Sequence, residues 1–124
     1  MIDSLQSPIP AFSLMGHPSF TTAFNNDKDA KFVLAQHLFG LGEAKDVLMA
    51  ISTSGNSKNV IKAVQVAKVK GIKIIGLTGE RGGELADFAD VTIKAPTNKV
   101  HEVQELHLPI YHFLCIVLER YFFD

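Results

Sequence analysis

The sequence predicts an α/β fold in which a parallel sheet lies between layers of helices. Apolar runs of strand length alternate with segments whose apolar residues recur at helical spacing. One run, Val47–Ile51, is apolar without interruption, as is typical of a parallel strand covered on both faces. Strands that alternate with helices form right-handed βαβ units. We therefore expect residues 1–124 to form one domain, a three-layer αβα sandwich.

The first half of the chain contains two expected strands and one expected helix. Pro10–Met15 is short and apolar, and a proline is tolerated at the start of a strand because it need not donate to a ladder there. Asp29–Phe39 has apolar residues near helical spacing, with Gly40 placed to end a helix. Val47–Ile51 is the second strand. Ser19–Asn26 fits neither pattern and ends in a turn or a helix cap.

The second half repeats the alternation more clearly. Ser57–Lys70 has a single apolar stripe and is followed by Gly71, so it is predicted to be a helix. The next expected elements are a strand at Ile72–Thr78 and a short helix at Glu84–Phe88. They are followed by a strand at Val91–Ala95 and by a long last helix from about Val100 almost to Phe123.

Composition is that of an ordinary soluble globular domain. Hydrophobic residues make up 47% and charged residues 20% of the chain. A formal net charge of −1 gives no general positive field, which argues against nucleic acid as the main partner. The single cysteine, Cys115, has no internal disulfide partner, so a cytoplasmic location is expected. No apolar run approaches a membrane span, and the first residues do not resemble a signal peptide, so no membrane partner is expected.

The segment Ser52–Ser57 is the main candidate for a ligand site, because it joins an apolar strand to the start of a helix. Backbone N–H groups there lack intrahelical partners and carry partial positive charge. Gly55 permits a close approach or a positive φ. An ordinary polar turn with Asn56 or Ser57 as the helix cap explains the same residues, and the segment alone leaves both interpretations open. The hydroxyls available to surround a phosphate are those of Ser52, Thr53, Ser54 and Ser57.

Other loops are expected to lie beside this segment. The carboxyl ends of parallel strands meet at one edge of the sheet, and ligands bind beyond that edge. The loops expected to converge there with Ser52–Ser57 are Thr78–Gly83, Pro96–Lys99 and Gly16–Asn26.

Four stretches together carry a family resemblance. They are Asp46–Leu48 with Ile51–Ser57, Gly76–Gly79 with Gly82–Gly83, Ala89–Val91, and Val103–His107 with His112. In order and spacing they resemble the SIS (sugar isomerase) domain family, and within it the sedoheptulose 7-phosphate isomerases. The resemblance implies a flavodoxin-like αβα fold, a sugar phosphate ligand, aldose–ketose isomerisation, and a homo-oligomer, either a dimer or a tetramer.

The resemblance also implies roles for single residues. In the family the Ser/Thr turn holds the sugar phosphate, which makes Ser52, Thr53, Ser54 and Ser57 the implied phosphate ligands. Isomerisation moves a proton between adjacent carbons and needs a base and an acid. The resemblance gives His112 an acid/base or metal-ligand role and Gln104 a metal-ligand role. Glu105 is a second acid/base candidate. His17 and Asp27 are weaker candidates for substrate contact.

The residues themselves leave other roles open. Tyr111 and Phe113 flank His112 and suggest a mostly buried helix, and the residues alone favour a core histidine bonded to a carbonyl. Glu105, in an early helical turn, suits an exposed surface near the positive end of the helix. His107 is expected to be structural or to face solvent.

The chain departs from the family pattern at its start. Family members normally begin with helices and a first strand that ends in a second Gly/Ser loop, and the helix after that loop supplies a Glu and a His. Nothing here matches that part, so we expect a domain truncated at the N-terminus. The absent strand would lie between Pro10–Met15 and Val47–Ile51. Those two strands therefore pair directly, or a partner's strand fills the gap, or the gap leaves unpaired edges.

Three functional hypotheses follow. The first is a phosphosugar isomerase, or its C-terminal portion, and the alternative is a non-catalytic phosphosugar-binding or regulatory module. The third is a truncated product with no activity of its own. Zinc is implied by resemblance alone, and a catalytic zinc site generally takes three protein ligands. Gln104 and His112 supply two, so zinc is expected only where a partner supplies the others, and this chain alone requires no cofactor. The apolar end of the last helix is expected to pack on another subunit.

Overall fold

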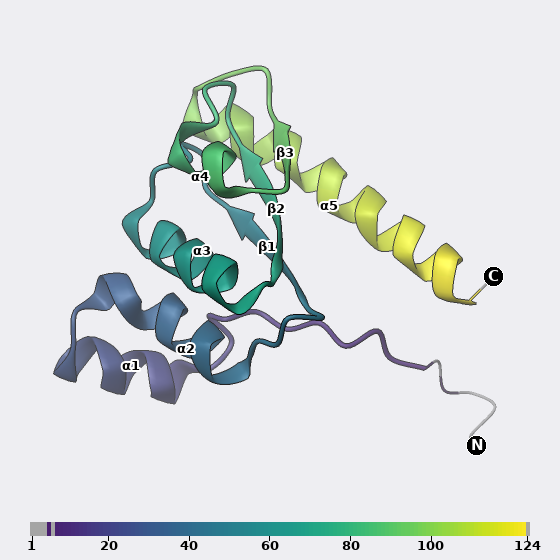
Figure 1. The fold of residues 1–124 in the computed structure, drawn as a ribbon. Coiled ribbons are helices and arrows are strands. Elements are labelled where there is room, and N and C mark those ends of the chain that lie inside the picture. The colour runs from purple at the N-terminus through teal and green to yellow at the C-terminus, as the bar shows by residue number, and fades with distance from the viewer. Residues whose placement is uncertain (1–4, 6, 124) are drawn as a thin grey trace.

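The computed structural model describes residue 5 and residues 7–123 (Figure 1). Three strands form one parallel sheet in the order β1-β2-β3. The elements are α1 (Pro18–Asp27), a 3₁₀ turn η2 (Ala30–Phe32), α2 (Val33–Leu41), β1 (Val47–Ile51), α3 (Lys58–Lys70), β2 (Lys73–Thr78), α4 (Gly83–Phe88), β3 (Val91–Lys94) and α5 (Val100–Phe123). From residue 47 onward, the predicted elements are confirmed to within about one residue at each end. No helix in the described part combines the length and hydropathy needed to span a bilayer.

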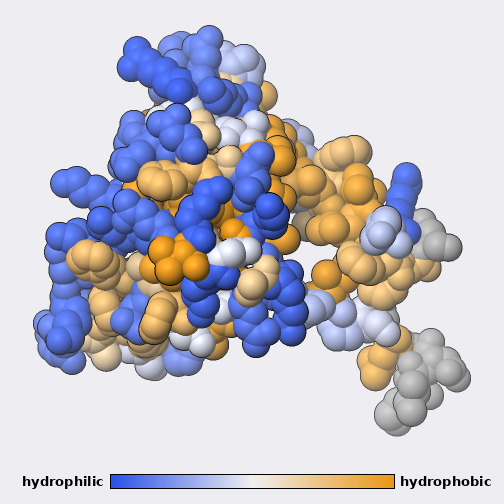
Figure 2. All heavy atoms as spheres, viewed as in Figure 1, coloured by the Kyte–Doolittle hydropathy of each residue, from blue (hydrophilic) through white to orange (hydrophobic). Residues whose placement is uncertain are grey.

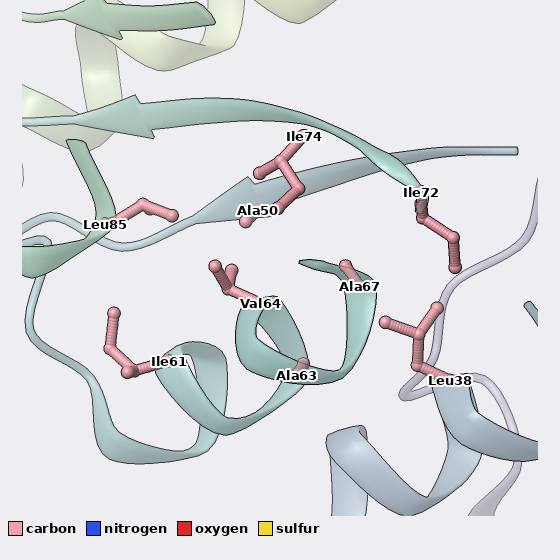
Figure 3. Close-up of a cluster of buried hydrophobic side chains, with 9 residues drawn as sticks. All are labelled: Leu38, Ala50, Ile61, Ala63, Val64, Ala67, Ile72, Ile74 and Leu85. Atoms are coloured by element: carbon pink, nitrogen blue, oxygen red, sulfur yellow. The ribbon is translucent and has the colours of Figure 1, made fainter. Parts of the chain in front are cut away.

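Helices cover both faces of the sheet (Figure 1), which confirms the three-layer αβα sandwich. The apolar stripe of α3 packs on one face together with residues of α2 and α4, and Figure 3 shows the side chains that meet there. On the other face, Val103 of α5 is fully buried against Gly79, at the end of β2. The main core cluster consists of Leu38, Ala50, Ile61, Ala63, Val64, Ala67, Ile72, Ile74 and Leu85.

The order of the strands follows from short crossovers. Helix α3 ends at Gly71, which adopts the left-handed conformation with φ +73° and donates its N–H to the carbonyl of Lys68. The chain therefore reverses within two residues and begins β2 beside β1, with Val47 opposite Lys73. Two such crossovers bring the carboxyl ends of all three strands to one edge.

The strand predicted at Pro10–Met15 is wrong. Residues 7–13 have no regular secondary structure, and residues 14–15 form a turn. The carbonyl of Leu14 accepts a hydrogen bond from Nδ1 of His37 (2.8 Å), which attaches this segment to α2 instead of β1. Pro8 and Pro10 lack the N–H that a ladder requires. Within the described residues the sheet has three strands instead of four, and direct pairing of this segment with β1 is excluded.

Two helices near the start differ from the expectation. The unassigned segment Ser19–Asn26 lies in α1, which begins with Pro18 at its first position, where a missing N–H is harmless. The helix expected at Asp29–Phe39 is divided into η2 and α2. The carboxylate of Asp29 accepts the N–H of Lys31 and caps the 3₁₀ turn, and α2 then continues past Gly40.

Asp90 connects β2 to β3 through main-chain and side-chain bonds. Its carboxylate accepts the N–H of Ile74 (2.8 Å), and its own N–H donates to the Ile74 carbonyl (2.9 Å). The bond from Ile74, with smaller contributions from Lys68 and Lys73, holds the pKa of Asp90 below its usual 3.8. A carboxylate with a lowered folded-state pKa stabilises the fold above the unfolded pKa, and this contribution is lost as pH falls through the folded pKa.

We predict that Asp90→Asn lowers the Tm at neutral pH, because it removes the charge that strengthens the bond from the Ile74 N–H and pairs with Lys68 and Lys73. Thermal unfolding followed by circular dichroism from neutral pH to below pH 3.8 measures this. The difference from the unsubstituted chain should shrink at the acidic end. Asp87→Asn, on the exposed side of α4, is the control and should have little effect at any pH. A constant difference for Asp90→Asn would contradict the proposed role of its charge.

Candidate functional site

The Ser52–Ser57 loop is internally hydrogen-bonded. The Oγ atoms of Ser52 and Ser57 lie 2.9 Å apart and share a hydrogen bond, and the N–H of Ser57 points at Ser52 Oγ (3.4 Å). The N–H of Gly55 donates to the Ser52 carbonyl (3.0 Å), which closes a tight turn. Ser54 is exposed, and its Oγ accepts the N–H of Asn56 (3.1 Å). Hydroxyls and amides are thus held close together at the end of β1.

Helix α3 begins in this loop without a side-chain cap. Ser57 occupies the N-cap position, but its hydroxyl bonds to Ser52 instead of to a backbone N–H of the helix. The first turn of α3 contains no acidic residue, and Lys58 begins it. The positive end of this 13-residue helix therefore lies at the hydroxyl cluster. The side chain of its cap residue accepts no hydrogen bond from the N–H groups of the first turn.

Main-chain hydrogen bonds join three loops at this edge, which confirms most of the expected convergence. The carbonyl of Thr53 accepts the N–H of Gly79 (2.9 Å), and the carbonyl of Gly55 accepts the N–H of Leu85 (2.9 Å). The Thr97 carbonyl accepts the N–H of Glu80 (3.0 Å), which attaches the loop after β3. The loop at Gly16–Asn26, by contrast, is largely α1 itself.

Asn56 joins two loops in a way that the sequence alone did not indicate. Its Oδ1 accepts the N–H of Glu84 (2.9 Å), at the start of α4, and its Nδ2 donates to the Ser54 carbonyl (3.2 Å). Sequence considerations treated Asn56 only as a possible helix cap. The sequence signal for this contact was the presence of glycine in both turns, Gly55-Asn56 and Gly82-Gly83. Two turns with glycine at the point of contact can bring their backbones close together.

The C-terminal helix presents its candidate residues to solvent. Gln104, Glu105 and His112 are exposed, and only Val103 and His107 of α5 are buried. Gln104 and His112 are separated by about 12 Å of helix rise. The explanation of His112 as a core histidine is therefore wrong, and so is the expectation of a mostly buried helix.

The core histidine of α5 is His107. Its side chain is only 2% exposed, and its Nε2 donates to the carbonyl of Thr78 (3.0 Å), at the end of β2. A carbonyl accepts only, so Nε2 carries the proton. This bond anchors α5 beside the loop that follows β2, and it confirms a structural role for His107.

The ligand candidates near the start of the chain lie at opposite ends of α1. His17 is exposed and packs edge-on against the ring of His37, 5.9 Å between centroids. Asp27 accepts a hydrogen bond from the side chain of neighbouring Asn26 (2.9 Å). Two residues later, Asp29 has a lowered pKa because of its bonds to Lys31 and, more weakly, the charge of Lys58. His17 and Asp27 are separated by about 15 Å of helix rise.

Comparison with known proteins identifies the family. The family model described as "SIS domain" matches residues 34–113, more than half of the chain. The chain belongs to the SIS domain family.

Curated relatives of this SIS domain are named "Phosphoheptose isomerase". One from Rhodospirillum rubrum is 38% identical over 92% of this chain and 61% of its own length. Another, from Cytophaga hutchinsonii, is 45% identical over 90% of this chain and 59% of its own. The SIS domain described here thus spans about three-fifths of the length of these relatives.

Solved structures share the fold. A phosphoheptose isomerase from Francisella tularensis superposes with a TM-score of 0.88 at 33% identity, over 93% of this chain and 62% of that one. The phosphoheptose isomerase GmhA from Neisseria gonorrhoeae superposes with a TM-score of 0.81 at 38% identity, and the match covers 84% of this chain and 59% of that one. The SIS fold is therefore preserved over nearly all of the residues present.

The donors of this SIS domain do not fit a catalytic zinc site by themselves. No group of three or more His, Cys, Asp or Glu side chains within the described residues is arranged to hold a metal ion. The two ligands implied by resemblance, Gln104 and His112, are one short of the usual three protein ligands and are two turns apart on α5.

The close contact at Gly55 gives a stability prediction. Gly55 has φ +69°, and an added Cβ would clash with the carbonyl of Gly82. We predict that Gly55→Ala destabilises the SIS domain by about 2 kcal/mol or more, in addition to weakening any ligand bound at the loop. Gly40→Ala is the control, because nothing lies within 4 Å of its added Cβ and α2 is helical there. Gly40→Ala should raise stability by about 0.5–1 kcal/mol. Urea unfolding measures both, and equal effects would contradict the packing argument.

The two histidines of α5 give a second prediction. His107→Ala removes a buried ring and one of the two hydrogen bonds that the Thr78 carbonyl accepts, the other coming from the Ala95 N–H, so unfolding free energy should fall by about 2–4 kcal/mol. His112→Ala changes an exposed side chain and should alter it by less than about 0.5 kcal/mol. Urea unfolding distinguishes the two. A large loss for His112→Ala would mean that this residue also supports the fold.

Proposed function

We propose that this chain carries the sugar-phosphate site of an aldose–ketose isomerase, with sedoheptulose 7-phosphate as the substrate class. The single observation that carries the proposal is the Ser52–Ser57 loop, where hydroxyls cluster at the uncapped start of α3. The relatives named phosphoheptose isomerase support it. Because those proteins are longer, turnover by this chain alone is not part of the proposal.

The loop suits a phosphate for electrostatic reasons. A phosphate dianion accepts hydrogen bonds from the hydroxyls of Ser52, Thr53, Ser54 and Ser57. The N–H groups at the start of α3 add donors, except that of Val60, which already donates to Asn59 Oδ1 (2.9 Å), and the helix dipole favours the negative charge. Lys58 adds a positive charge beside the first turn. Phosphate binding holds the non-reacting end of the sugar and leaves its other end to be positioned for chemistry.

Isomerisation also needs a base and an acid on neighbouring carbons. His112 and Glu105 remain the proposed acid/base residues, and Gln104 and His112 remain proposed metal ligands only where a partner supplies the other ligands. All three lie on the exposed surface of α5, so further residues are needed to close the site around the reacting carbons. We propose that these residues come from polypeptide outside this chain or from a second subunit.

A homo-oligomer and a cytoplasmic location are also proposed. Large apolar side chains are exposed along the last turns of α5, as at the interfaces of obligate oligomers. Cys115 is exposed and unpaired, which suits a reducing compartment. Light scattering at several protein concentrations tests the oligomer, and a monomer at all of them would refute it.

Ligand-dependent stability tests the phosphate site. Sedoheptulose 7-phosphate at about 100 times its Kd should add about 2.7 kcal/mol to the stability of the fold and raise the Tm. Ser54→Ala and Ser57→Ala should each reduce the rise in Tm, and the double variant should abolish it. Ser19→Ala, on the exposed surface of α1, is the control and should keep the full rise. Differential scanning fluorimetry with inorganic phosphate and sedoheptulose as partial ligands identifies the recognised group.

A coupled assay for sedoheptulose 7-phosphate turnover separates the two functional classes when the part of a longer relative outside the match is added as a separate polypeptide. Turnover that is lost in His112→Ala supports the isomerase. Stabilisation by the ligand without turnover in this mixture favours a binding or regulatory module. No rise in Tm with any sugar phosphate would refute the phosphate site in this chain.

A further inference from the structure

A cleft between the first helices lies apart from the Ser52–Ser57 loop. Figure 1 shows α2 between α1 and α3, and the cleft is lined by residues of these three helices and of η2. Its volume is about 490 Å³, within the range of small-molecule sites. Val66, which lines the cleft from α3, is separated from Ser57 by about 13 Å of helix rise. The cleft is therefore a second candidate site.

Three phenylalanine rings line the cleft. Phe24 comes from α1, Phe32 from η2 and Phe39 from α2. Phe32 and Phe39 are seven residues apart, which places them on one side of the same helical stretch. Both are exposed, Phe39 to 62%, whereas Val33 and Leu38 on another side of that stretch are buried. The stretch thus has two apolar sides, and the side with Phe32 and Phe39 is open to a ligand.

Ammonium groups lie over two of these rings. Nζ of Lys31 is 5.2 Å and Nζ of Lys62 is 5.7 Å from the centre of the Phe32 ring. Nζ of Lys70 is 5.2 Å from the centre of the Phe39 ring, and it donates to the Phe39 carbonyl (2.6 Å). Aromatic faces attract cations, so the rings help to hold these charges beside the cleft.

The charge at the cleft is positive. Asp29 is the one carboxylate among the described lining residues, and it already forms an ion pair with Lys31 (2.6 Å). Lys28 lines the cleft as well, and within the described part of the chain Lys28, Lys62 and Lys70 form no ion pair. On the face seen in Figure 2, hydrophobic and hydrophilic side chains lie side by side over α2 and α3. This site therefore suits an apolar anion, although the whole chain has a formal net charge of −1.

We propose that this cleft binds a small aromatic carboxylate. The rings of the ligand lie among the phenylalanine side chains, where an aromatic pair is more favourable than apolar burial alone. Its carboxylate is attracted by the ammonium groups of Lys28, Lys62 and Lys70. Gln36 lines the same cleft, and its side-chain amide offers a further donor. This proposal does not depend on any ligand at the Ser52–Ser57 loop.

Titration with naphthalene-2-carboxylate, followed by NMR spectra of the isotope-labelled chain, tests the site. We expect a Kd of about 1 mM or tighter, which is the usual affinity for a ligand of this size. The amide signals of Phe32, Gln36 and Phe39 should shift, and those of Ser54 and Ser57 should not. Sedoheptulose 7-phosphate should not displace the probe, whether or not it binds at the loop.

Two analogues of the probe separate charge from aromatic character. Naphthalene-2-methanol keeps the rings without the charge and should bind about fivefold or more weakly. Decahydronaphthalene-2-carboxylate keeps the charge on a saturated skeleton and should bind about threefold or more weakly. Equal affinity for all three compounds would refute the proposal, because the cleft would then bind any apolar molecule.

Matched variants locate the contact. Phe39→Ser removes one ring of the cleft and should weaken binding at least about threefold. Phe113→Ser is its control, because Phe113 lies on α5 and is exposed to nearly the same extent, 63%. Lys62→Met removes a charge and should weaken binding about twofold or more, whereas Lys45→Met, before β1, should leave it unchanged. Circular dichroism of each variant verifies folding, and equal losses in Phe39→Ser and Phe113→Ser would refute the assignment.

Four further results would overturn the proposal. One is the absence of any shift at about ten times the expected Kd. Another is a set of shifts confined to the Ser52–Ser57 loop, which would place the probe there. The third is a dimer that dissociates in Phe39→Ser, because a second copy would then occupy the cleft. The last is binding of the acidic peptide Asp-Phe-Asp-Phe without binding of the naphthalene probe, which would indicate a protein segment as the occupant.

Discussion

The contact between the turns at Gly55 and Gly82 is the constraint on which the ligand edge depends. The two backbones lie so close that neither turn has room for a side chain pointing at the other. The hydrogen bond from the Leu85 N–H to the Gly55 carbonyl holds the two turns together. This bond spans thirty residues of sequence, so the shape of the Ser52–Ser57 loop depends on the packing of β1, α3 and β2 and not on local sequence alone.

Sequence patterns predicted the second half of the fold well, for a physical reason. Val47–Ile51 and Lys73–Thr78 are apolar runs between glycine-rich turns, and α3 has a single stripe with Gly71 at its end. Local preference and tertiary packing therefore agree there. Pro10–Met15 has the composition of a strand, yet a strand forms only beside a neighbour, and in the sheet of the described residues this segment has none. The composition of a segment does not report whether a neighbour is available.

The candidate site was predicted unevenly for a related reason. The hydroxyl loop is contiguous in sequence and sits where a strand meets a helix, so chemistry and position could be inferred together. Residues of α5 could not be assigned to a face, because apolar residues occur nearly all round its last turns. The packing of Val103 against Gly79 and the bond from His107 to Thr78 help to fix the rotation of α5, and that rotation turns His112 outward.

The uncapped start of α3 has a thermodynamic consequence. A serine cap contributes about 1 kcal/mol to a helix, and here the Ser57 hydroxyl bonds to Ser52 instead. Helix α3 also supplies Ile61, Ala63, Val64 and Ala67 to the main core. An anion seated at its first turn would thus act as the absent cap, and occupancy of the loop would tighten the hydrophobic interior. The same helix end would then serve both ligand binding and the stability of the fold. Local unfolding of the ligand-free protein would begin at the first turn of α3.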